Sequence, residues 1–138
     1  PILNVWENII FPISLDGRRP DRNFIMQAVR LLGLENKLDC LPHHLSGGQQ
    51  QRVAIIRAIA GKPSIILADE PTGNLDTKTS DGVIGLLKMT SREFHQTIVM
   101  ITHNPQIAQI ADDVIRMSDG KVVEGSADFC VHTAKYVL

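Results

Sequence analysis

The chain has 138 residues, with 14 Lys and Arg against 15 Asp and Glu, which leaves a net charge of −1. This balance neither favours nor excludes nucleic acid or a membrane surface as a partner. Apolar residues make up 43% of the chain and charged residues 21%, an ordinary composition for a folded domain. The apolar runs are far shorter than the roughly 20 residues that cross a bilayer. We therefore expect a folded chain in the cytosol that reaches a membrane only through another subunit.

The first half of the sequence has two helical patterns. A helix is expected over Asp21–Leu32, with Asp21 as the N-cap and Gly33 as the stop signal. Its apolar face would consist of Phe24, Ile25, Ala28, Leu31 and Leu32. A second helix is expected over Gln49–Ala60, because apolar residues recur three or four apart and Gly61 follows.

The second half alternates strands and helices. Ser64–Asp69 and Thr97–Thr102 are short, apolar and β-branched, which is typical of parallel strands buried on both faces, and Thr77–Phe94 is the helix between them. A helix near Pro105–Ile110 and a strand over Val114–Met117 follow. Asp119 and Gly120 then favour a tight turn into residues 121–124. The fold class is α/β with a C-terminal β-hairpin.

Polar side chains follow both predicted parallel strands, at the sheet edge where ligands bind in such folds. Asp69 and Glu70 end the first strand, and His103 ends the second. One carboxylate can hold Mg²⁺ while the next polarises an attacking water, and an imidazole can donate to a phosphate. Taken alone, the acidic pair is also compatible with a polar turn, and His103 with a cap on the helix that begins at Asn104-Pro105.

The segment Leu45-Ser46-Gly47-Gly48-Gln49 precedes the second predicted helix. Its paired glycines let backbone amides and the helix N-terminus approach an anion, and the Ser46 hydroxyl adds a donor. By itself this turn is also compatible with a flexible helix entry. His43 and His44, just before it, lack a third ligand at metal spacing and are expected to be part of a structural loop.

The string LSGGQQQRVAIIRAIAGKPSIILADEPTGNLD, residues 45–76, resembles the signature motif, Walker B strand and D-loop of the ABC-type ATPases. The later TIVMITHN resembles the switch-histidine loop of the same family, and the likeness extends from Pro1 to about Gly125. The sequence DEPTGNLD, residues 69–76, is similar to that of the bacterial ABC ATPases that drive lipoprotein release and the export of macrolides or antimicrobial peptides.

The resemblance implies a partial P-loop NTPase core and a site shared by two ATPase subunits, with ATP and Mg²⁺ as cofactors. It implies a helical subdomain over residues 1–62, half of the ATPase core over 63–125 and a tail over 126–138. The γ-phosphate on the opposite subunit would be contacted by Ser46, Gly47, Gly48 and Gln49. In the other half-site, Asp69 would position Mg²⁺, Glu70 would be the general base, His103 would contact the γ-phosphate, and Asp76 would signal across the dimer.

The resemblance also implies partners and a location. Pro1–Arg19 and Asp21–Leu32 resemble the region that docks against a transmembrane permease, so the protein would lie peripherally on the cytoplasmic face of the membrane. Nucleic acid is not expected as a partner. The transported substrate is not encoded here, because selectivity resides in the membrane subunits.

One motif of the family is missing, since no GxxxxGK[ST] phosphate loop occurs in the sequence. We therefore expect the chain to be the C-terminal part of an ABC ATPase domain and to be inactive alone. Two alternatives remain: a non-hydrolysing module that lends its signature segment to a partner, and a soluble ABC protein of DNA repair or translation.

Overall fold

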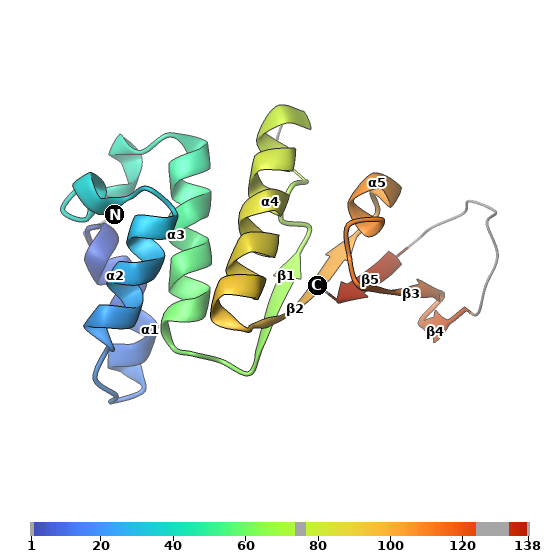
Figure 1. Cartoon of the computed structure of the whole chain (residues 1–138), viewed down its shortest axis with the longest axis horizontal. Helices are drawn as coiled ribbons and strands as arrows, with labels where there is room; N and C mark the ends of the chain where they lie inside the picture. Colours follow the sequence, from blue (N-terminus) through green and yellow to red (C-terminus); the bar gives the residue numbers. More distant parts are fainter. Residues whose placement is uncertain (1, 74–76, 124–132, 138) are drawn as a thin grey trace. The chain divides into compact units, whose positions relative to one another are not determined.

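The computed structural model describes residues 2–73, 77–123 and 133–137 of the chain (Figure 1). The chain divides into two compact units, Pro1–Ser64 and Ile65–Leu138. The first unit is helical, and the second contains a sheet with two helices. Among the described helices, none combines the length and apolar character needed to span a bilayer.

The first unit opens with helix α1, Val5–Leu15, which the sequence analysis did not predict. Its N-cap is Asn4, whose side chain accepts from the Glu7 backbone N–H, while the Glu7 carboxylate accepts from Asn4 N. This reciprocal capping box satisfies two otherwise unpaired donors. Proline at position 12 lies inside the helix and removes one intrahelical donor, a signal that normally argues against a helix. Burial decides the outcome, because one side of α1 is in the core: Val5, Ile9 and Ile13.

Helix α2, Arg22–Leu31, begins and ends where its sequence signals predicted. The Asp21 side chain accepts a hydrogen bond from Phe24 N at 3.1 Å, and Gly33 takes a φ of +65° just beyond the last turn. Its most buried positions are Ile25, Ala28 and Val29. The expected apolar face is therefore confirmed at its centre, with Val29 added and Phe24 only partly buried.

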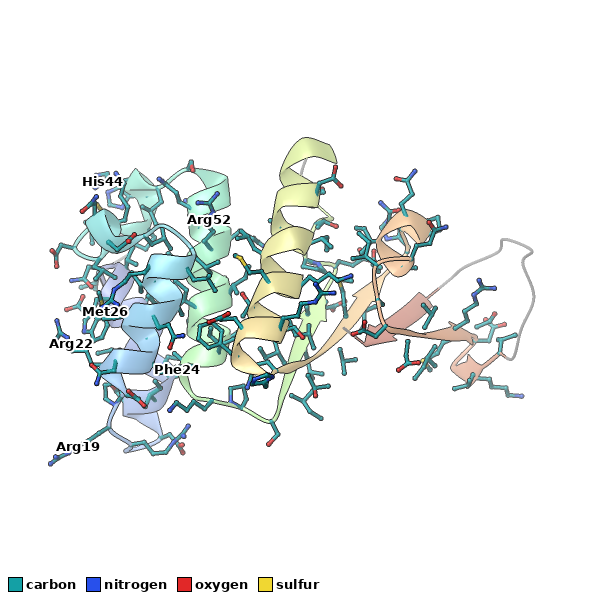
Figure 2. All side chains as sticks on the ribbon, in the orientation of Figure 1. Arg19, Arg22, Phe24, Met26, His44 and Arg52 are labelled. Carbon is teal, nitrogen blue, oxygen red and sulfur yellow. The ribbon has the colours of Figure 1, made fainter. Side chains whose placement is uncertain are left out.

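Helix α3, Gly47–Ala60, packs against both α1 and α2 and closes the core of this unit. Ile56 and Ile59 are fully buried. Two short 3₁₀ turns, η1 (Glu35–Lys37) and η2 (Pro42–His44), connect α2 to α3. Arg52, labelled on α3 in Figure 2, donates to the Leu32 carbonyl at 3.3 Å and so ties α3 to the end of α2.

The second unit contains a mixed five-stranded sheet with the strand order β1-β2-β5-β3-β4. The strands are β1 (Ile65–Asp69), β2 (Thr97–Thr102), β3 (Asp113–Ser118), β4 (Lys121–Val122) and β5 (Thr133–Val137). Strands β1 and β2 are parallel and are linked through α4 (Thr77–Phe94), while the other pairs are antiparallel. Helices α4 and α5 (Pro105–Ala108) both contact β2.

Burial in β1 corrects one expectation. Ile66 is 7% exposed, but Ile65 and Leu67 are 54% and 79% exposed. Successive side chains of a strand point to opposite faces, so only one face of β1 is covered. The expectation that this strand is buried on both faces is therefore wrong. In β2, Ile98 and Met100 on one face are fully buried, while Val99 and Ile101 on the other face are only partly buried.

The C-terminal part of the sheet agrees with one prediction and adds a strand that no pattern indicated. Asp119 and Gly120 have φ values of +50° and +75°, as a tight turn between β3 and β4 requires. Strand β5 comes from the tail, for which nothing was predicted, and it pairs with both β2 and β3. Its place in the middle of the sheet depends on partners far away in sequence.

Stability of the first unit should depend on pH through Asp21. The pKa of this carboxyl lies below its ordinary value because Lys62 Nζ donates to it at 2.8 Å and because Phe24 N–H donates to it as well. Such a group stabilises the folded state above its unfolded pKa of about 3.9, and this contribution is lost as the pH falls through the lower folded pKa.

Asp21→Asn keeps an N-capping side chain but cannot ionise. We expect it to lower the melting temperature, followed by circular dichroism, at pH 7, and we expect the difference from wild type to shrink below pH ~4. Asp39→Asn, at an exposed position, is the control and should show no such convergence. A pH-independent difference for Asp21→Asn would contradict the assigned ion pair.

Candidate functional site

The parallel register of β1 and β2 brings Glu70 and His103 to the same edge of the sheet. Asp69 of β1 is paired with Ile101 of β2, and the Glu70 backbone N–H donates to the Ile101 carbonyl at 2.9 Å. Glu70 directly follows β1, and His103 directly follows Thr102, the last residue of β2. Two side chains that are 33 positions apart in sequence thus meet at the carboxyl ends of the strands.

One oxygen of the Glu70 carboxylate receives two contacts from His103. The His103 ring Nδ1 lies 2.7 Å from Glu70 Oε1, and the His103 backbone N–H donates to the same oxygen at 3.2 Å. The side chains are 37% exposed for Glu70 and 71% exposed for His103. Because the carboxylate accepts at Nδ1, the ring Nε2 is left for another partner. The sequence prediction that these residues share one edge is confirmed.

The backbone at Glu70 is in the left-handed region, with a φ of +43°. A residue with a Cβ rarely adopts this conformation and pays for it in strain, so such residues concentrate at functional sites. The turn is closed by Gly73, whose N–H donates to the Glu70 carbonyl at 3.0 Å. The sharp turn holds the carboxylate at the sheet edge instead of continuing the strand.

His103 is fixed by its neighbours in sequence. The Thr102 side chain is 1% exposed, and its Oγ1 accepts from Asn104 N at 3.1 Å. Asn104 is the N-cap of α5, and its side chain accepts from Gln106 N at 2.9 Å. The alternative in which His103 caps this helix is therefore wrong, because Asn104 does so. Thr102 was not singled out from sequence, since a threonine ending a strand carries no distinctive signal.

Asp69, the last residue of β1, is exposed, and its carboxylate has no hydrogen bond or ion pair within the described part of the chain. Carboxylate oxygens suit Mg²⁺, which keeps several waters and phosphate oxygens in its shell and therefore needs few protein ligands. No group of three His, Cys, Asp or Glu side chains gathers anywhere in the described ranges. Asp69 thus fits a magnesium site whose other ligands are phosphate and water oxygens. It does not fit a site built from protein ligands alone.

The segment Leu45–Gln49, called the signature segment here, leads into the N-terminus of α3 in the first unit. Ser46 is the N-cap, with its Oγ accepting from Gln49 N at 3.3 Å, and helix formation starts at Gly47. The N–H groups of the first helical turn have no intrahelical acceptor and carry the positive end of the helix dipole. A Cβ at Gly47 or Gly48 would meet nothing within 4 Å, and neither residue has a positive φ.

Within the described part of the chain, no contact requires glycine at positions 47 and 48. Glycine in a helix costs up to about 1 kcal/mol relative to alanine. A bare backbone there lets a group from outside the chain approach closely. This favours an anion site over the alternative of a flexible helix entry, since the turn is closed by a capping box.

Other residues from the sequence analysis fall outside this site or outside the described ranges. Asp76 lies in a segment that the structure does not describe. The ring centroids of His43 and His44 are 4.1 Å apart in an edge-to-face contact within η2.

Comparisons with known proteins identify the family of this chain. Residues 1–73, more than half of the chain, match the family described as ABC transporter. The chain belongs to this family, whose cassettes share the P-loop NTPase fold expected from the sequence.

Two curated relatives illustrate the likeness. The "Macrolide export ATP-binding/permease protein MacB" of Rhodopirellula baltica is 42% identical over 128 residues, which cover 90% of this chain and 19% of MacB. The "Lipoprotein-releasing system ATP-binding protein LolD" of Acinetobacter baylyi is 41% identical over 129 residues, which cover 91% of this chain and 57% of LolD. The chain thus spans little more than half of such ATP-binding subunits.

A solved cassette shows the same fold. The dimeric bacterial ABC transporter cassette MJ0796 is 38% identical with a TM-score of 0.68, over 90% of this chain and 56% of that chain. A second structure of MJ0796 is a post-hydrolysis state bound to ADP and Pi.

Removing the Glu70 carboxylate should loosen the loop that carries His103. In Glu70→Ala, the His103 amide loses its acceptor, so its hydrogen exchange, measured by NMR, should accelerate about 5- to 10-fold. Asp69→Ala removes the neighbouring carboxylate and serves as the control, with exchange at His103 unchanged. Equal acceleration in both variants would mean that the strand end, and not the Glu70 contact, holds the loop.

Proposed function

We propose that this chain is part of an ATP-hydrolysing subunit that drives export through a transmembrane permease. The observation that carries the proposal is the contact between Glu70 and His103 at the carboxyl end of a parallel strand pair. It lies beside the carboxylate of Asp69, which has no hydrogen bond or ion pair to the residues that the structure describes. A carboxylate, an imidazole and a metal-binding oxygen at one edge are the groups that phosphoryl transfer to water needs.

The roles follow from the chemistry of each side chain. Mg²⁺, held through Asp69, would neutralise charge on the β- and γ-phosphates. Glu70 accepts a proton from the attacking water, since its second carboxylate oxygen, Oε2, makes no contact with His103. His103 engages Glu70 through Nδ1, and its Nε2 would donate to the γ-phosphate when both ring nitrogens carry hydrogens.

The signature segment acts on the nucleotide of a second ATPase subunit in this proposal. Gly47 and Gly48 supply backbone N–H groups at the start of α3, and Ser46 can donate its hydroxyl hydrogen while its Oγ accepts from Gln49 N. The open space beside both glycines supports an outside ligand. The dimeric arrangement of the MJ0796 cassette supports a second subunit as its source. Asp76 would signal across the same dimer interface.

The names of MacB and LolD support export and a permease partner, and hence a position on the cytoplasmic face of the membrane. In this arrangement the surface of α1 and α2 docks against the permease. The sequence contains no phosphate loop to hold the β- and γ-phosphates. We therefore propose that residues 1–138 do not hydrolyse ATP alone and work only with the rest of a complete cassette.

Glu70→Gln tests the general base. In the complete transporter, ATP hydrolysis should fall at least about 100-fold, because an amide cannot accept the proton, while ATP binding stays within about twofold. A coupled phosphate-release assay and nucleotide titration would measure the two quantities. Hydrolysis at the wild-type rate would remove the base assignment.

Gly48→Ala separates function from stability. The methyl group has room in the chain itself and improves helix propensity, so the free energy of unfolding should rise by up to about 1 kcal/mol. Hydrolysis by the complete transporter should nevertheless fall at least about tenfold, because the methyl group blocks close approach of phosphate.

The matched control is Gly82→Ala, at an exposed helical position on α4 where a Cβ also meets nothing within 4 Å. It should stabilise the chain similarly and leave hydrolysis unchanged. If Gly48→Ala hydrolysed ATP normally, the bare backbone at this position would have no part in the phosphate contact.

A further inference from the structure

Two consecutive glutamines, Gln49 and Gln50, hold the signature turn through different backbone groups. The Gln49 side chain accepts from Ser46 N through Oε1 at 2.9 Å. The Gln50 side chain donates from Nε2 to the Pro42 carbonyl at 3.0 Å and to the Leu45 carbonyl at 3.2 Å. One glutamine therefore uses only its acceptor in these contacts, and the other uses only its donor.

The hydrogen-bonding partners determine which amide atom each glutamine uses. Ser46 N–H is a donor, so the Gln49 atom facing it must be the oxygen. The Pro42 and Leu45 carbonyls are acceptors, so the Gln50 atom facing them must be the NH₂ group. Glutamine thus serves as an acceptor at position 49 and as a donor at position 50.

We infer that Gln49 and Gln50 are positioning residues for the proposed phosphate contact, because their side chains hold the turn that carries Gly47 and Gly48. Gln49 closes the capping box on Ser46 and so occupies the N–H of the cap residue. The N–H groups of Gly47 and Gly48, beyond the cap, are left for a ligand. This adds a positioning role to the phosphate contact that the resemblance implied for Gln49.

Gln50 sets the approach to the turn. The Leu45 N–H donates to the Pro42 carbonyl at 3.1 Å, and Leu45 is 7% exposed. The Gln50 NH₂ group bridges the carbonyls of these same two residues and ties them to the first turn of α3. Together with the Leu45–Pro42 backbone bond and the packing of Leu45, this bridge defines the path from η2 into the signature turn.

Making the same substitution at both positions tests the inference. Gln49→Glu keeps an acceptor for Ser46 N, whereas Gln50→Glu replaces a donor with an acceptor that faces two carbonyl oxygens. Both changes add one negative charge to the first turn of α3, so each is the control for the other. Gln49→Leu, which has no acceptor, is the companion variant at the first position.

The first measurement is hydrogen exchange of the Leu45, Ser46 and Gln49 amides by NMR on the chain. Gln49→Glu should leave all three within about twofold of wild type, while Gln50→Glu and Gln49→Leu should accelerate exchange about 5- to 10-fold. Exchange at Val29 and Ile56, in the buried core of this unit, should stay unchanged and show that the fold is intact. Equal responses to the two glutamate variants would overturn the inference, because charge alone would then explain them.

The second measurement is ATP hydrolysis by the complete transporter, and this step rests on the proposed function. Gln50→Glu should lower kcat about tenfold with the KM for ATP within about twofold, because it disturbs only the segment presented to the opposite nucleotide. Gln50→Arg should restore at least half of kcat, because a guanidinium can again donate to both carbonyls. If Gln50→Glu lowered KM and kcat together, or Gln50→Arg failed to rescue, positioning by donation would be wrong.

The failure of this inference and the failure of the proposed function are distinguishable. Absence of ATP hydrolysis by the wild-type complete transporter would refute the proposed function whatever the glutamine variants do, and normal hydrolysis by Glu70→Gln would remove only the base assignment. Loss of hydrolysis in Glu70→Gln together with normal kcat in Gln50→Glu would refute only the positioning role of Gln50.

Discussion

The parallel pairing of β1 with β2 is the constraint on which the candidate catalytic site depends. Its register aligns Asp69 with Ile101, so the residues that follow the two strands come within hydrogen-bonding distance. Shifting one strand by a single residue would turn every side chain of that strand to the other face and separate Glu70 from His103. The left-handed backbone at Glu70 is the local cost of turning the chain at this point.

The signature segment is built on a different principle. There the essential feature is the backbone N–H groups that the turn leaves available. Side chains satisfy the ends of the turn, and the glycines place no side chain beside these N–H groups. A helix N-terminus satisfied entirely by its own chain would have no donors left for an anion. The capping box and the Gln50 bridge give the turn a fixed shape while leaving these donors available.

The comparison of sequence and structure shows which signals were sufficient. Local signals located α2 because the N-cap Asp21 and the terminating Gly33 lie directly at the two ends of the helix. Helix α1 was missed because Pro12 is a strong local signal against a helix, and the burial of Val5 and Ile9 outweighs it only in the folded unit. The exposed Leu67 in β1 shows the opposite failure, since an apolar run does not reveal whether both faces are covered.

By itself, the sequence determined the chemistry that is available: the acidic pair, the histidine at a strand end, the glycine pair after Ser46, and the family these residues resemble. These features are carried by residue type and short spacing, which do not depend on the rest of the fold. Only the tertiary structure decided that Glu70 contacts His103, that β5 lies between β2 and β3, and that Gln49 and Gln50 face different partners. Each of these depends on strand register, or on backbone groups brought together by the turn, and such geometry is settled only when the chain folds.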